Sequence, residues 1–181
     1  YLEDNYLVIG LDKNYSDITR EEQFIKIETD LISFVKDDNY QNNIILSIKN
    51  LIPNSITKLV IINNAAEQII KPIQDITFSD FDRSISVNAL APFFLIKNFI
   101  KELSSYKGHI INITSIHSKL TKPNFTCYAS SKALLEGINR SLSLELSSMG
   151  ISVNSVAPAA IQTEMLRSGF KKKEQLRELE N

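Results

Sequence analysis

The sequence predicts an α/β protein built around a mostly parallel sheet. Short apolar runs rich in β-branched residues alternate with longer amphipathic stretches, which is the pattern of βαβ units. The apolar runs are nearly continuous, as expected of strands buried on both faces. The length of 181 residues fits one domain, and no repeat, low-complexity tract or linker divides the chain. We therefore expect residues 1–181 to form a single domain.

Five segments have the length and composition of strands. In chain order they are Tyr6–Leu11, Phe24–Ile27, Leu59–Ile62, His109–Ile113 and Ser152–Val156. Residues that follow such strands lie at the carboxyl edge of the sheet, where open α/β folds bind their ligands. This edge is the first place to look for functional residues.

Two helices are predicted in the first half of the chain and its middle. One lies between the second and third strands, and the other lies between the third and fourth. The earlier helix covers Asn39–Leu51 and is closed by Pro53. The later one covers Ser79–Leu103, with Ser79 placed to cap a first turn that carries acids. Pro92 lies inside this second helix, so we expect a kink there.

A third helix is predicted from about Tyr128 to Met149. Gly150 follows it at the position of a C-terminal cap. Its apolar residues recur at helical spacing and are expected to form one buried stripe. They are Leu134, Leu135, Ile138, Leu142, Leu146 and Met149.

Charge and composition exclude several classes of protein. The net charge of −1, without a sustained basic block, argues against nucleic acid or an anionic membrane as a partner. A single Cys and two His argue against a disulfide framework or a metal site. No apolar run of about 18 residues and no signal-peptide pattern is present. We expect a cytoplasmic protein with a small polar ligand.

Tyr128 and Lys132 form the first candidate catalytic pair. They are four residues apart on one predicted helix, so the ammonium can approach the phenol and favour the phenolate. Tyr128 could then exchange a proton near neutral pH. The spacing is short enough to arise by chance, and an exposed lysine beside a boundary tyrosine is an equally good interpretation of the pair alone.

Polar residues follow two predicted strands and support that pair. Ser115 comes just after His109–Ile113, and Asn63-Asn64-Ala65-Ala66 follows Leu59–Ile62. Asn88 precedes Pro92 by four positions, so its carbonyl loses the helical N–H partner and can hold a water or a lysine. Each feature also has a plain structural interpretation, a turn or a helix broken for packing.

Together these residues resemble the short-chain dehydrogenases/reductases. In that family an Asn-Asn-Ala-Gly segment, a helical Asn, a Ser and a Tyr-x-x-x-Lys pair follow one another along the chain. Here Asn63–Ala66, Asn88, Ser115 and Tyr128 with Lys132 occur in that order. The resemblance runs from about Tyr6 to Leu166 and implies a Rossmann-like, doubly wound parallel sheet in three α/β/α layers.

The resemblance also implies roles for these residues in a reaction that interconverts a carbonyl and an alcohol. Tyr128 would be the general acid/base, Lys132 would lower its pKa and bind the nicotinamide ribose, and Ser115 would orient the substrate oxygen. Asn88 would hold, through its backbone carbonyl, a water that links Lys132 to solvent. His117 lies where the family lines its substrate pocket, although a solvated loop residue is the simpler interpretation. Cys127 is expected only to pack.

A nicotinamide cofactor is the implied partner of this site. Asp12 would bond the adenosine ribose 2′-hydroxyl and repel a 2′-phosphate, so NAD is favoured over NADP. Asp30 and Leu31 match the family's adenine contact. The remaining expected cofactor contacts are Asn64, Ala65 and Ala66 along the adenosine side, and Pro158, Ala159, Ile161 and Thr163 over the nicotinamide.

The sequence departs from the family pattern at two glycine positions and at both ends. Ala66 and Ala159 stand where the family has glycine. No glycine lies between Gly10 and Gly108, and the first strand with its glycine-rich phosphate loop is missing, as is the last strand. We therefore expect a partial chain in which the first two strands cannot pair with Leu59–Ile62, because the missing strand lies between them.

The resemblance favours an enzyme that acts on small, partly apolar carbonyl substrates. Two other interpretations remain. One is a non-catalytic relative that senses the cofactor or acts as a scaffold, which the absent loop favours and the intact Asn88, Ser115, Tyr128 and Lys132 set disfavours. The other, a nucleic-acid-binding module, lacks a basic face. The family's habit of pairing its two long helices implies a homodimer or homotetramer.

Overall fold

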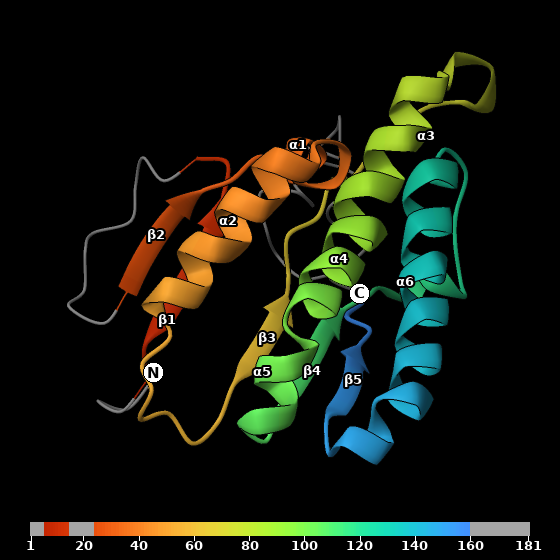
Figure 1. The fold of residues 1–181 in the computed structure, drawn as a ribbon. Coiled ribbons are helices and arrows are strands. Elements are labelled where there is room, and N and C mark those ends of the chain that lie inside the picture. Colours follow the sequence, from red (N-terminus) through yellow and green to blue (C-terminus); the bar gives the residue numbers. More distant parts are fainter. Residues whose placement is uncertain (1–5, 15–23, 160–181) are drawn as a thin grey trace.

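All five strands of the structure run in the same direction, in two parallel sheets (Figure 1). The structure is a computed structural model that describes residues 6–14 and 24–159. The first sheet pairs β1 with β2, and the second has the order β3-β4-β5. Their bounds are β1 Val8–Asp12, β2 Phe24–Glu28, β3 Val60–Asn63, β4 His109–Ile113 and β5 Ser152–Val156. All five predicted strands are confirmed, with ends shifted by at most two residues.

The two sheets share no ladder within the described residues. β1 pairs with β2 in register from Val8–Phe24 to Asp12–Glu28. β3 pairs with β4, and β4 pairs with β5. Val60 and Ile62 lie on the same face of β3 and are exposed, at 39% and 61%. The sequence prediction that the first two strands do not pair with the third is confirmed.

Two consecutive helices connect the sheets. α1 covers Leu31–Lys36 and α2 covers Asp38–Leu51. The sequence analysis predicted α2 within one residue and missed α1, which is short and has only one fully buried apolar side chain, Phe34. Asp30 caps α1 and Asp37 caps α2, each by accepting two backbone N–H groups.

The predicted helix 79–103 is present but divided. It consists of α3 Phe78–Ile85, a π-helix Ser86–Leu90, α4 Ala91–Asn98 and α5 Ile100–Ser105. The widened turn accommodates Pro92, which has no N–H to offer the carbonyl of Asn88. The cap is Thr77 rather than the predicted Ser79: its hydroxyl accepts the Asp80 N–H, and Asp80 bonds back to the Thr77 N–H.

The last α-helix of the described residues, α6, covers Thr126–Glu145 and is followed by a short 3-10 turn, Ser147–Met149. Gly150 adopts φ +72°, which confirms the predicted left-handed cap. The predicted apolar stripe is partly wrong, because Leu134 and Met149 are exposed. The buried face instead begins at Cys127 and Tyr128 and continues through Ser131, Leu135 and Leu142.

The helices α1 to α6 cover one side of the strands, with α4 and α5 over the second sheet and α6 beside β5 (Figure 1). One apolar core joins them to the strands through Phe34, Ile45, Ile61, Ile96, Phe99, Leu103, Ile110, Leu142, Leu146 and Val153. The fold is thus Rossmann-like, with flanking helices on parallel sheets. No helix among the described residues is long and apolar enough to cross a membrane.

Candidate active site

Ser115, Tyr128 and Lys132 lie together at the carboxyl end of β4. Ser115 follows β4, while Tyr128 and Lys132 lie one turn apart in the first part of α6. The side chains are buried, with exposures of 6%, 7% and 2%. The Lys132 Nζ donates to the carbonyl of Ile113 at 2.7 Å and is 5.8 Å from the centre of the Tyr128 ring. The spacing therefore gives a true neighbouring pair rather than an exposed lysine.

Burial governs the protonation of this pair. It raises the pKa of Tyr128 above its ordinary value of 10, and a side-chain hydrogen bond with Ser115 acts in the opposite direction. Burial lowers the pKa of Lys132 from 10.5 to about 8. The depression of the Tyr128 pKa by Lys132, which the sequence analysis expected, is wrong: Lys132 contributes no resolved shift, and desolvation of the phenolate outweighs the hydrogen bond with Ser115.

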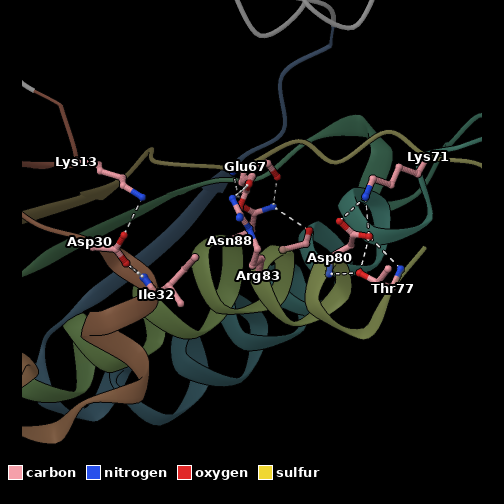
Figure 2. A network of polar contacts seen from close by, with 10 residues as sticks. Lys13, Asp30, Ile32, Glu67, Lys71, Thr77, Asp80, Arg83 and Asn88 are labelled. Atoms are coloured by element: carbon pink, nitrogen blue, oxygen red, sulfur yellow. Dashed lines mark hydrogen bonds and ion pairs between the residues drawn. The ribbon is translucent and has the colours of Figure 1, made fainter. Parts of the chain in front are cut away.

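Asn88 connects the segment after β3 to α6 (Figure 2). Its side-chain oxygen accepts the Glu67 N–H at 2.7 Å, and its amide nitrogen donates to the Glu67 carbonyl at 2.8 Å and the Ser131 hydroxyl at 2.9 Å. Ser131 in turn donates to the carbonyl of Tyr128 at 2.8 Å. The Asn88 side chain is therefore a structural bridge, and a role for its backbone carbonyl remains a prediction.

The segment Asn64–Ala66 leaves β3 between two fixed points. Asn63 ends the strand, and Glu67 is held by Asn88 and by an ion pair with Arg83 (Figure 2). Farther along, Lys71 forms an ion pair with Asp80 at 2.7 Å and its N–H donates to the Asn124 carbonyl. The small side chains of Ala65 and Ala66 thus lie on a backbone that neighbouring elements hold in place.

A buried chain of three amides was missed by the sequence analysis. Asn63 donates to Asn112 at 2.8 Å, and Asn112 donates to Asn139 at 2.9 Å, which joins β3, β4 and α6. All three side chains are buried. Asn139 lies 11 residues after Tyr128, on the same helix face, and this polar residue within a buried face is the signal that could have revealed the chain.

The acids predicted for the adenosine end lie at the end of β1 and just after β2. Asp12 is the last residue of β1, and its carboxylate accepts the Asn14 N–H at 3.1 Å. Asp30 accepts two N–H groups of α1, which Leu31 opens, and forms an ion pair with Lys13 at 3.0 Å. The hydrogen bond from the Ser33 N–H is the main reason that the Asp30 pKa is lowered.

Two of the four residues predicted to contact the nicotinamide, Pro158 and Ala159, lie in the described segment after β5. The Pro158 carbonyl accepts the Ile116 N–H at 3.1 Å, which places Pro158 against the residues that follow Ser115. Ala159 is the last described residue. Ile161 and Thr163 lie outside the described residues.

His117 and Cys127 flank the candidate tyrosine. The His117 ring stacks on Phe125 at 4.5 Å and meets the edge of Tyr128 at 6.1 Å, so it is packed rather than solvated. Cys127 is fully buried and burial raises its pKa, which agrees with a packing role. The described part of the chain contains no group of three His, Cys, Asp or Glu side chains that could hold a metal ion.

Comparison with known proteins agrees with this geometry. Residues 1–174 match the family described as short chain dehydrogenase. The chain is 34% identical over 134 residues to glucose 1-dehydrogenase of Gluconobacter oxydans, covering 71% of this chain and 50% of that protein. It is 31% identical over 107 residues to hydroxynaphthalene reductase-like protein Arp2 of Metarhizium anisopliae, covering 59% of this chain and 40% of that protein.

A solved structure shares nearly the whole fold. A 4-hydroxyisoleucine dehydrogenase mutant complexed with NADH and succinate superposes with a TM-score of 0.85 at 26% identity, covering 98% of this chain and 72% of that one. The chain belongs to the short-chain dehydrogenase family. The matches span about half or less of the length of the two sequence relatives named above, 50% and 40%.

Proposed function

We propose that this protein is a nicotinamide-dependent oxidoreductase that interconverts a carbonyl and an alcohol on a small substrate. The observation that carries the proposal is the buried cluster of Ser115, Tyr128 and Lys132 at the carboxyl end of β4. A buried lysine that, among the described residues, bonds a backbone carbonyl alone and lies beside a buried phenol is costly to a fold and is typical of a catalytic site.

The described residues fit a nicotinamide cofactor at both of its nucleoside ends. Asp12 ends β1 and Asp30 follows β2, and both would hold the adenosine, while Asn64–Ala66 offers a backbone with small side chains along its path. Lys132, which bonds the Ile113 carbonyl, and Pro158, which accepts the Ile116 N–H, would contact the nicotinamide riboside. The cofactor, when bound, supplies or accepts the hydride.

Tyr128 exchanges the proton in this proposal. Because its pKa lies above 10, the phenol is protonated at neutral pH and can donate to the oxygen of a substrate carbonyl. Ser115, which hydrogen-bonds Tyr128, would orient the same oxygen. In the reverse direction Tyr128 must first lose its proton, so we expect alcohol oxidation to become faster as the pH rises.

Lys132 and Asn88 support this proton transfer. With a pKa of about 8, Lys132 is mainly an ammonium at neutral pH and stabilises the phenolate that forms when Tyr128 donates its proton. Asn88 fixes the π-helix against α6 through Ser131, which adjoins Lys132. Its backbone carbonyl would hold the water through which Lys132 exchanges protons with solvent.

Replacing Tyr128 by phenylalanine tests the assignment. Tyr128→Phe removes only the phenol oxygen, so we expect the reduction of small ketones and aldehydes by NADH to fall at least about 100-fold, the contribution typical of a general acid. Fluorescence titration should show an unchanged dissociation constant for NADH. An unchanged rate would refute the role of Tyr128, and binding of NADH without turnover by the unaltered protein would favour a cofactor-sensing function.

A further inference from the structure

The three buried asparagines described above connect the ends of β3 and β4 to the middle of α6. Asn63 donates to Asn112 at 2.8 Å, and Asn112 donates to Asn139 at 2.9 Å. Asn63 and Asn112 face each other in the ladder between β3 and β4, whereas Asn139 lies on α6. We call these three residues the amide chain. Their exposures of 9%, 0% and 8% show that it lies inside the protein.

The amide chain passes next to the group that holds Lys132. Asn112 directly precedes Ile113, whose carbonyl accepts the Lys132 ammonium at 2.7 Å. Asn139 follows Lys132 by seven residues, about two helical turns, so the two residues lie on one face of α6. Two adjacent residues of β4 thus each bond α6, one at Lys132 and one at Asn139. Both bonds can form only when the helix has one particular position along the strand.

Apolar packing fixes that position less sharply than these bonds do. Leu135 and Leu142 flank Asn139 along the buried face of α6, with exposures of 1% and 7%. Apolar burial has no preferred direction, so the leucines hold α6 against the sheet without strongly selecting its position along β4. A hydrogen bond needs a separation of about 2.9 Å and good alignment, and a buried N–H that loses its acceptor is costly. The bond from Asn112 to Asn139 therefore disfavours positions of α6 that the leucines would tolerate.

We propose that Asn139 is a positioning residue for Lys132 and, through it, for Tyr128. By accepting the Asn112 N–H, Asn139 holds α6 at the position along β4 that brings the Lys132 ammonium to its carbonyl partner. The effect on rate rests on the proposed function, in which Lys132 stabilises the phenolate of Tyr128. A shift of about 1 Å in a group of this kind can lower a rate about 100-fold, so a bond two turns away is expected to affect turnover.

Replacement of Asn139 by leucine tests the effect on rate. The probe is whichever of cyclohexanone, ethyl acetoacetate and glyceraldehyde the full-length protein reduces fastest with NADH. Asn139→Leu keeps most of the side-chain volume and removes the acceptor, so kcat should fall about tenfold while KM for the probe changes less than about twofold. Asn139→Asp keeps an oxygen that can accept the Asn112 N–H, and it should restore kcat to within about threefold.

Leu146→Ala is the matched control for lost stability. Leu146 caps the end of α6, is 3% exposed and belongs to the apolar core, so its truncation leaves a cavity and lowers the stability of the same helix. The bond between Asn112 and Asn139 remains in this variant. At a temperature where circular dichroism shows both variants folded, kcat of Leu146→Ala should stay within about twofold of the original protein.

NMR reports on Lys132 without requiring turnover. In protein made with lysine that carries carbon-13 at Cε, the Lys132 signal is identified by its absence in Lys132→Met. Its titration midpoint should lie at about pH 8, because burial lowers this pKa; Tyr128 is the neighbouring titratable group. In Asn139→Leu the midpoint should rise by at least about half a pH unit, because a displaced ammonium meets water. In Leu146→Ala it should not move.

Two outcomes would overturn the proposal. One is an unchanged Lys132 midpoint in Asn139→Leu, and the other is an unchanged kcat in Asn139→Leu when Tyr128→Phe abolishes turnover. If Asn139→Leu does not fold, Asn139→Ala, which is too short to reach Asn112, gives the same comparison. The proposed function fails separately, if Tyr128→Phe keeps the original rate. A raised Lys132 midpoint in Asn139→Leu would even then support the positioning of the lysine by Asn139.

Discussion

Lys132 is the most unusual residue of the described chain. It is 2% exposed, and its ammonium donates a hydrogen bond to the Ile113 carbonyl. Burying a charge with so little compensation destabilises the protonated form, which lowers the lysine pKa to about 8. Burial of the Lys132 ammonium thus lowers the stability of the folded protein, and we expect it to be useful only when the site acts on a substrate.

The free energy of unfolding should therefore depend on pH through Lys132. Between about pH 8 and 10.5 the unfolded chain binds a proton that the folded chain has released, so stability rises with pH in this window. From about pH 7 to pH 9 the original protein should gain about 1 kcal/mol relative to Lys132→Met. Urea unfolding at both pH values measures this. If the free energy of unfolding changed equally with pH in the original protein and in Lys132→Met, Lys132 would keep its ordinary pKa.

Asp12 is expected to set the choice between the two nicotinamide cofactors. It ends β1, and a carboxylate there accepts a ribose 2′-hydroxyl but repels a 2′-phosphate. Asp12→Ala should raise the ratio of NADPH to NADH affinity by about tenfold, the equivalent of about 1.4 kcal/mol. Fluorescence titration measures both affinities. Asp75→Ala, an exposed acid on a separate 3-10 helix, controls for the change in net charge; if both variants shift the ratio equally, Asp12 has no specific role.

At the scale of the elements, the site depends on how helices start, widen and end. The π-helix Ser86–Leu90 turns Asn88 inward, so that it bonds Glu67 on one side and Ser131 on the other. A regular helix with 3.6 residues per turn would present a different face at this point. Pro92 thus affects the orientation of Asn88, four residues earlier, because the helix turn before the proline is widened.

The turn from α5 into β4 should be the least tolerant of added volume. A Cβ on Gly108 would lie 2.7 Å from the Cβ and the carbonyl oxygen of Leu103, which is fully buried. Gly108→Ala and Gly108→Asn should both lower the free energy of unfolding by about 1–3 kcal/mol. Thermal unfolding and urea titration measure the loss.

Gly150 differs from Gly108, because its backbone conformation, rather than lack of space, disfavours a side chain. It adopts φ +72° with nothing within 4 Å of an added Cβ. Gly150→Ala should cost about 1 kcal/mol, and Gly150→Asn less, since asparagine tolerates the left-handed region. If alanine and asparagine lowered the free energy of unfolding equally at Gly108 and at Gly150, the steric cause at Gly108 and the conformational cause at Gly150 would not be distinct.

At the scale of the whole molecule, the outer face of α4 and α6 is suited to a second copy of the chain. A groove there is lined by Phe93, Ala133, Leu134, Gly137, Ile138, Ser141, Leu142 and Glu145. Leu134 is 39% exposed in this groove, although the sequence pattern placed it in the core. The small residues Ala133, Gly137 and Ser141, spaced four apart on α6, allow close approach of another helix. These features support the dimer expected from the family.

Leu134→Arg should therefore convert the protein to a monomer. A charged side chain in an apolar interface is left without a partner and opposes association. Sedimentation equilibrium measures the mass of the particle. Leu144→Arg is the control, because Leu144 is 79% exposed on the same helix and does not line the groove. A dimer that persists in Leu134→Arg would place the interface on another surface.

The sequence by itself determined the strands, the class of fold and the residue types of the candidate site. Continuous β-branched runs such as His109–Ile113 and the four-residue spacing of Tyr128 and Lys132 are local features that a chain carries into any context. The Gly150 cap was likewise predictable, because left-handed backbone favours glycine.

Only the tertiary structure decided which groups meet and how they titrate. Asn63, Asn112 and Asn139 are separated along the chain by 49 and 27 residues, and packing alone makes them one hydrogen-bonded chain. Burial likewise reversed the expected direction of the Tyr128 pKa shift. Desolvation and long-range hydrogen bonds depend on the whole surrounding structure, whereas periodicity and capping depend on a few neighbouring residues.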